Sequence, residues 1–102
     1  MTKKEIIEYL KSIKPIFQKK GIEEIALFGS FAQEDTNIYS DIDIAIKKSR
    51  DFIQKQGAYE YFNVINEIKY MLIKKFGKNV DILDLDSQSP FLKDIKKDLI
   101  YV

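Results

Sequence analysis

The segment that decides the fold lies at residues 41–46 and reads Asp41-Ile42-Asp43-Ile44-Ala45-Ile46. Apolar side chains recur at every second position, and this period of two predicts a half-buried strand. The three isoleucines would then point toward the core, while Asp41, Asp43 and Ala45 share the opposite face. Two carboxylates about 6.6 Å apart on one face repel each other unless a cation or protons intervene. Taken alone, such a pattern is more often a strand face that simply meets water.

Two other segments predict strands that could pair with this one. Residues 22–28 are apolar-rich and end at a Gly-Ser pair, as a buried strand before a tight turn does. Residues 80–85 predict a third strand, and residues 100–102 a short edge strand. In the third strand Asp81 and Asp84 have opposite parity, so they point to opposite faces. Asp81 is therefore the better third carboxylate for a site shared with the Asp-x-Asp strand.

Helical periodicity separates these strands. Residues 3–20 predict an amphipathic helix, which Pro15 is expected to kink or restart. Residues 51–76 predict a second helix, with Gly57 as a break in its first part. Residues 90–99 predict a last one, with Ser89 as its N-cap and Pro90 as its first position. The order of elements predicts an α/β (α+β) fold in which helices pack against a small sheet.

Length and composition restrict the classes of function that this chain can have. The 102 residues, 45% of them hydrophobic, predict one domain spanning 1–102. A net charge of +1 gives no electrostatic reason to expect nucleic-acid binding. No run of about 18 apolar residues and no hydrophobic leader is present, so we expect a cytoplasmic protein. The chain has no cysteine and no histidine, so thiol chemistry, zinc sites and histidine bases are excluded.

The candidate site therefore consists of oxygen donors. Asp41, Asp43 and Asp81 on adjacent strands could hold two divalent ions of the kind that activate an attacking oxygen and stabilise a leaving phosphate. Without histidine, a carboxylate must also take the proton of the attacking hydroxyl, and Asp81 is the strongest candidate. Gly29 and Ser30 add a turn whose backbone N–H groups and hydroxyl favour phosphate oxygens, although an isolated Gly-Ser pair is usually an ordinary turn.

The combination of Leu27-Phe28-Gly29-Ser30, Asp41-Ile42-Asp43-Ile44 and Val80-Asp81-Ile82, in this order and spacing, resembles the DNA polymerase β-like nucleotidyltransferase superfamily, and within it the minimal nucleotidyltransferases. The resemblance runs from about residue 22 to residue 102. It implies the nucleotidyltransferase fold, a Gly29-Ser30 turn that holds the triphosphate of ATP, and metal ligands at Asp41, Asp43 and Asp81. Two Mg²⁺ ions are implied, with Mn²⁺ as an alternative.

The resemblance also implies a partner. Minimal nucleotidyltransferases often act as antitoxins that transfer AMP from Mg-ATP to a tyrosine of a HEPN-domain ribonuclease toxin, so we expect a hetero-oligomer. Family members commonly continue Gly-Ser-x-Ala-Arg-Gly, whereas this chain has Gln33 and Glu34 in place of the last two residues. Two alternatives therefore stay open: a catalytically weak or inactive antitoxin that acts by binding the toxin, and a nucleotidyltransferase with a small-molecule acceptor.

Overall fold

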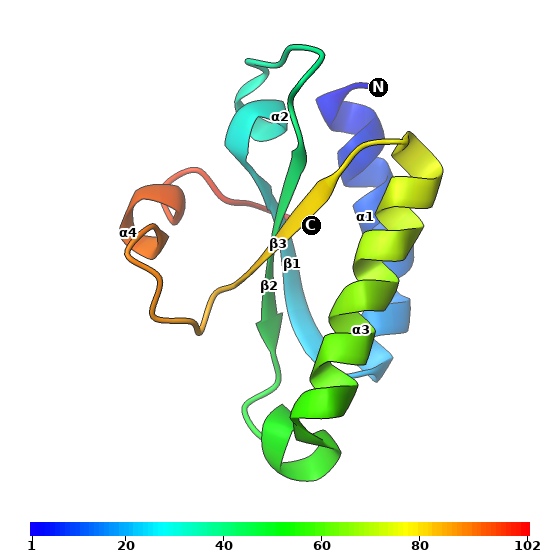
Figure 1. Cartoon of the computed structure of the whole chain (residues 1–102), viewed down its shortest axis with the longest axis vertical. Coiled ribbons are helices and arrows are strands. Elements are labelled where there is room, and N and C mark those ends of the chain that lie inside the picture. The colour runs from blue at the N-terminus through cyan, green and yellow to red at the C-terminus, as the bar shows by residue number, and fades with distance from the viewer.

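The computed structural model describes all residues, 1–102, and contains a mixed sheet of four strands in the order β3-β2-β1-β4 (Figure 1). The strands are β1 (Ile22–Phe28), β2 (Ile42–Lys48), β3 (Val80–Asp84) and β4 (Ile100–Tyr101). β1 pairs antiparallel with both β2 and β4, whereas β2 and β3 are parallel. All four predicted strands are thus present: β1 has the predicted bounds, and the ends of the others differ by at most two residues.

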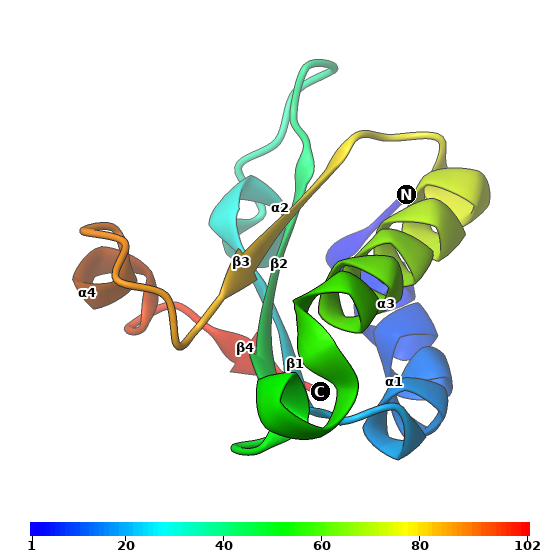
Figure 2. The ribbon, with the colours of Figure 1, turned by 60° about the horizontal axis from the view of Figure 1, so that its bottom comes forward.

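Two long helices cover one face of this sheet. Figures 1 and 2 show α1 (Lys3–Lys19) and α3 (Phe52–Phe76) side by side on the same side of the strands. The short helices α2 (Gly29–Gln33) and α4 (Leu92–Ile95) follow β1 and β3, and α4 lies on the other side of the sheet. This arrangement confirms the predicted α/β fold. No helix is both long enough and apolar enough to cross a membrane.

The hydrophobic core lies between the sheet and the two long helices. Its fully buried side chains include the three alternating isoleucines of β2, as the period of two predicts. The other large side chains with less than 2% exposure are Ile6, Leu10, Phe17, Ile22, Ile25, Leu27, Phe52, Ile68 and Leu72. Burying one such side chain contributes about 1.5–3 kcal/mol, so the core accounts for the orientation of β1 and β2.

The first helix is continuous through Pro15, so the predicted kink or restart is wrong. Thr2 caps its start, because the Thr2 hydroxyl accepts the backbone N–H of Glu5 at 3.1 Å. Pro15 is exposed, and the helix turn that contains it is anchored by the buried side chains of Ile13 and Phe17 on the opposite face. Packing of that face outweighs the hydrogen bond that proline cannot donate.

The structure confirms the predicted break in α3 but not the predicted length of the last helix. Gly57 has φ 87° and ψ 162°, so it breaks α3 near its start as expected. The predicted last helix over residues 90–99 is present but much shorter, because α4 has only four residues and none of them is buried. Phe91 is 67% exposed, so the apolar spacing there finds no core surface to pack against. Ser89 accepts the N–H of Phe91 at 3.3 Å but does not cap the helix.

Candidate active site

The strand register places Asp43 and Asp81 side by side. In the parallel pair β2–β3, Asp43 is opposite Asp81, and in the antiparallel pair β1–β2, Phe28 is opposite Asp43. Residues paired in this way point to the same face, here the face away from α1 and α3. All three line a pocket of about 480 Å³ on that face, together with Ile82, Leu83, Phe91 and Ile95. The pocket thus combines two carboxylates with an apolar wall.

Asp41, the third predicted carboxylate, lies beside this pocket. It directly precedes β2 and lines a neighbouring pocket of about 330 Å³, whose other residues include Tyr39 and Lys78. As placed, the acidic side chains do not form a group of three that could hold one ion. The structure therefore brings Asp43 and Asp81 into one pocket, whereas Asp41 lines a different one.

The three carboxylates still interact electrostatically. Burial, followed by the charges of Asp81 and then Asp41, raises the pKa of the Asp43 carboxyl to about 6. Neighbouring negative charges disfavour ionisation of a carboxyl group. A divalent cation placed among the carboxylates would remove this electrostatic penalty. The donor set is made of carboxylate oxygens, which are the ligands that Mg²⁺ and Mn²⁺ prefer. The residues present therefore suit a hard divalent cation.

This raised pKa predicts how stability depends on pH. Folding raises the pKa of Asp43 from about 3.9 to about 6, so the folded protein binds the proton more tightly than the unfolded chain. The resulting stabilisation is fully present below about pH 4 and is lost as the pH rises through 6. We expect the wild-type melting temperature, measured in EDTA and compared with that of Asp43→Asn, to fall by a few degrees across this window. Equal pH profiles for the two proteins would contradict the assignment.

Gly29 connects the pocket to the turn after β1. Its φ is +76°, a conformation that L side chains rarely adopt, and a Cβ added there would lie 2.1 Å from Oδ2 of Asp43. Glycine is thus required both for the backbone conformation and for the close approach of Asp43. Ser30 follows in the first turn of α2 and is half-buried. The predicted phosphate-binding pair therefore adjoins the predicted metal ligands.

The two departures from the family pattern lie at the end of α2. Glu34 has φ 58°, a left-handed conformation that favours glycine, and it ends the helix. Its side chain is exposed. The Gln33 amide donates to Asp98 at 3.4 Å, which ties α2 to the segment before β4. Glu34 is therefore a strained helix end, and Gln33 has a local structural contact.

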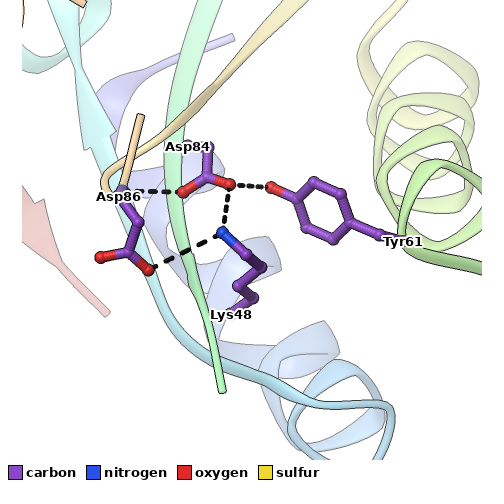
Figure 3. Close-up of polar contacts among 4 residues, drawn as sticks. All are labelled: Lys48, Tyr61, Asp84 and Asp86. Carbon is purple, nitrogen blue, oxygen red and sulfur yellow. Dashed lines mark hydrogen bonds and ion pairs between the residues drawn. The ribbon is translucent and has the colours of Figure 1, made fainter. Parts of the chain in front are cut away.

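A polar cluster that the sequence did not reveal lies on the helix-covered face, at the far end of β2 (Figure 3). The Tyr61 hydroxyl of α3 and the Lys48 ammonium of β2 both donate to Oδ2 of Asp84, the latter at 2.9 Å. The Asp86 N–H donates to Oδ1 of Asp84 at 2.8 Å. Burial raises the pKa of Asp84, but the donors from Tyr61 and Lys48 outweigh it and hold that pKa below its usual range. The cluster joins β2, β3 and α3.

Removing one donor should show that this cluster is structural. Tyr61→Phe is expected to lower the free energy of unfolding by about 1 kcal/mol, because one hydrogen bond to a charged, half-buried group is lost. Nucleotidyltransferase activity should stay within twofold of wild type. Urea denaturation checks the first value, with Tyr59→Phe as the control, because Tyr59 is exposed on the same helix. A large loss of activity without loss of stability would instead assign the cluster to catalysis.

The comparisons with known proteins agree on one family. Residues 11–102 match the family model described as "Polymerase beta, Nucleotidyltransferase". Two relatives from Methanocaldococcus jannaschii are each named "Putative protein adenylyltransferase". One is 36% identical over 104 residues, covering 99% of this chain and 98% of the relative, and the other is 34% identical over 89 residues, covering 87% of each.

Two solved structures share the fold. A chain in the crystal structure of a toxin–antitoxin with AMP-PNP has a TM-score of 0.52 and 26% identity over 87% of this chain, which spans 61% of that longer chain. A chain in a mutant form of the toxin–antitoxin MntA-HpeT has a TM-score of 0.58 at 22% identity, covering 99% of this chain and 71% of that one. Together with the family match and the paired aspartates, these findings show that the chain belongs to the polymerase β nucleotidyltransferase family.

Proposed function

We propose that this nucleotidyltransferase transfers AMP from Mg-ATP to a tyrosine hydroxyl of a partner HEPN-domain toxin and thereby neutralises the toxin. The observation that carries the proposal is the pairing of Asp43 with Asp81 beside the Gly29 turn, in a pocket on the sheet face away from α1 and α3. Such a face leaves room for both a nucleotide and an acceptor from another chain. The naming of the relatives as protein adenylyltransferases supports the adenylyl group and the protein acceptor.

Each site residue has a defined task in this reaction. Backbone N–H groups at Gly29 and the hydroxyl of Ser30 would bind the triphosphate, while Asp41, Asp43 and Asp81 would hold the Mg²⁺ ions. When bound, Mg²⁺ supplies positive charge that offsets the charge developing on the phosphate oxygens. Asp81 accepts the proton of the tyrosine hydroxyl as its oxygen attacks the α-phosphorus in line. A new P–O bond forms to the tyrosine, the bond to the β-phosphate bridge breaks, and pyrophosphate leaves.

The toxin partner is supported by the two toxin–antitoxin structures that share the fold. A phosphate ester on a toxin tyrosine adds negative charge, which would disfavour RNA binding by the toxin. The pocket itself has apolar residues such as Phe28 and Leu83 next to Asp81, so an aromatic acceptor side chain would find an apolar contact beside the proposed base.

The decisive experiment is intact-mass measurement after mixing the protein with Mg-ATP and the product of the adjacent reading frame. An AMP-sized increase on the partner is expected, and it should disappear with the Asp41→Asn/Asp43→Asn double variant. A modified partner tyrosine, located by peptide mapping, would support the acceptor class. An active wild-type protein that modified only itself or a small molecule would contradict the toxin acceptor.

A binding-only antitoxin is the second candidate, and Glu34 is the observation that favours it. Glu34 and the adjacent Asp35 are both acidic and exposed next to α2, where added negative charge opposes a triphosphate. In that case the double aspartate variant would still protect cells from the toxin. Loss of protection by the same folded variant would support the enzyme instead.

A further inference from the structure

The outward face of α3 carries a continuous apolar stripe. Its residues are Tyr59, Phe62, Asn66, Tyr70 and Ile73, which we call the α3 stripe. Tyr59, Phe62, Tyr70 and Ile73 are 83%, 62%, 65% and 41% exposed, and Asn66 is exposed as well. At 100° per residue these five positions lie within a narrow arc, opposite the side of α3 that is buried in the core. Single exposed apolar residues are common, but four in one line along a helix indicate a docking surface.

The position of α3 leaves this stripe free. Figures 1 and 2 show α3 at the outside of the molecule, next to α1 and to one side of the sheet. The stripe is on a different element from Gly29, Asp43 and Asp81, so it is not part of the candidate active site. It extends over about 21 Å of helix, enough for one short helix-to-helix contact.

The spacing of the stripe is symmetric about Asn66. Phe62 and Tyr70 lie four residues on either side of it, and Tyr59 and Ile73 lie seven residues on either side. If a second copy of α3 is laid antiparallel with the two Asn66 side chains at the twofold axis, Phe62 meets Tyr70 and Tyr59 meets Ile73. Each side chain amide of Asn66 can then donate to the carbonyl oxygen of the other. A polar residue at one position of an apolar seam is a known device for fixing register.

The charges beside the stripe are complementary in the same arrangement. Glu60, Glu67 and Lys74 are seven residues apart and share one flank of the helix. In the antiparallel pair Glu60 of each copy faces Lys74 of the other, so the dimer contains two such pairs. Lys74 already lies at the stripe, 6.0 Å from the centre of the Tyr70 ring. The two Glu67 side chains meet near the axis, but each is neutralised within its own chain by Lys20 at 2.6 Å.

The charges of the two halves of α3 are complementary in the same arrangement. Between the break at Gly57 and Ile68 the charged residues of α3 are Glu60 and Glu67, whereas the part from Lys69 onward contains only basic charged residues. An antiparallel pair places acidic halves against basic halves and opposes the two helix dipoles, whereas a parallel pair would do neither. We propose that the α3 stripe is an interface at which two copies of this chain form a twofold-symmetric dimer through antiparallel α3 helices.

The test is a charge exchange followed by sedimentation equilibrium of the full-length protein. Wild type should form a weak, concentration-dependent dimer. Glu60→Lys and Lys74→Glu should each weaken dimerisation by about tenfold, because each variant creates two like-charge pairs per dimer. A 1:1 mixture of the two variants, and the double variant, should return to within about threefold of wild type, because opposite charges again face each other.

The controls address folding and the choice of face. Phe62→Ser should abolish the dimer, whereas Ile38→Ser, which changes an 80%-exposed apolar residue outside the stripe, should not. Circular dichroism confirms that each variant is folded. A wild-type protein that is monomeric at every concentration up to ~1 mM would overturn the proposal. So would a mixture that does not recover, or a Phe62→Ser variant that loses only toxin binding, which would assign the stripe to the toxin.

Discussion

Asp43→Asn is expected to abolish nucleotidyl transfer and at the same time to make the protein more stable. The carboxylate of Asp43 lies beside that of Asp81 in the pocket, so its loss removes one proposed Mg²⁺ ligand. We expect activity to fall at least about a thousandfold, as it does when a group that stabilises transition-state charge is lost. Incorporation of radiolabelled AMP into the partner measures this effect.

The gain in stability follows from the raised pKa of the same carboxyl. A shift from about 3.9 to about 6 corresponds to roughly 3 kcal/mol against the ionised form at neutral pH. Because Asp43 is only partly buried, solvent screening reduces the expected gain from Asn to about 1 kcal/mol, or ~4–8 °C in melting temperature. Thermal denaturation of both proteins in EDTA at pH 7.5 measures this gain in melting temperature.

Asp84→Asn is the matched control for this prediction. Donors from Tyr61 and Lys48 hold the pKa of Asp84 below its usual range, so neutralising Asp84 should lower stability while Asp43→Asn raises it. An Asp43→Asn protein that lost activity but melted at a lower temperature would show that native contacts favour the Asp43 carboxylate, contrary to the electrostatics described above.

Gly29→Ala should lower both the stability and the activity of the protein. An Ala Cβ at φ +76° is strained, and it would meet Oδ2 of Asp43 at 2.1 Å, so Asp43 or the turn must move. We expect a loss of about 2–3 kcal/mol in the free energy of unfolding, since the backbone conformation alone costs about 1 kcal/mol. Activity should fall at least about a hundredfold because the turn and Asp43 are both displaced. Urea denaturation and the AMP-transfer assay measure the two effects.

Gly77→Ala separates the cost of backbone strain from the cost of the clash with Asp43. Gly77 has φ +66°, but nothing lies within 4 Å of its added Cβ, so only the backbone cost should appear and activity should be retained. In addition, Gly29→Ala placed in an Asp43→Ala background should destabilise the protein only slightly more than Gly77→Ala does, because the clashing oxygen is gone. Equal losses for Gly29→Ala and Gly77→Ala in the wild-type background would rule out the close approach to Asp43.

The elements that the sequence predicted well are those buried on one side. Burial of one face forces the alternation in β2, so the orientation of Ile44 and Asp43 follows from the pattern itself. Parity also predicted that Asp81 and Asp84 point to opposite faces, and the structure confirms this by placing Asp81 beside Asp43 and Asp84 against Tyr61. The register between β2 and β3 could not be read from either strand alone.

The features that the sequence did not predict depend on contacts between distant segments. Tyr61 and Asp84 meet only because α3 crosses over between two parallel strands. The apolar spacing at residues 91–99 is helical, but the sheet presents no core surface there. Pro15 is tolerated because the opposite face of α1 is anchored in the core, which local propensity does not record. Glu34 accepts a left-handed conformation that its residue type disfavours.

The alternation in β2 also determines which changes in chain length this protein can tolerate. A one-residue insertion or deletion within β2 would turn Asp43 into the hydrophobic core and expose the isoleucines, so folding and chemistry would be lost together. The loop between the end of α2 and Asp41, residues 35–40, has no such constraint. Evolution of this chain by length variation is therefore confined to its loops, and the strand that carries the aspartates can change only by substitution.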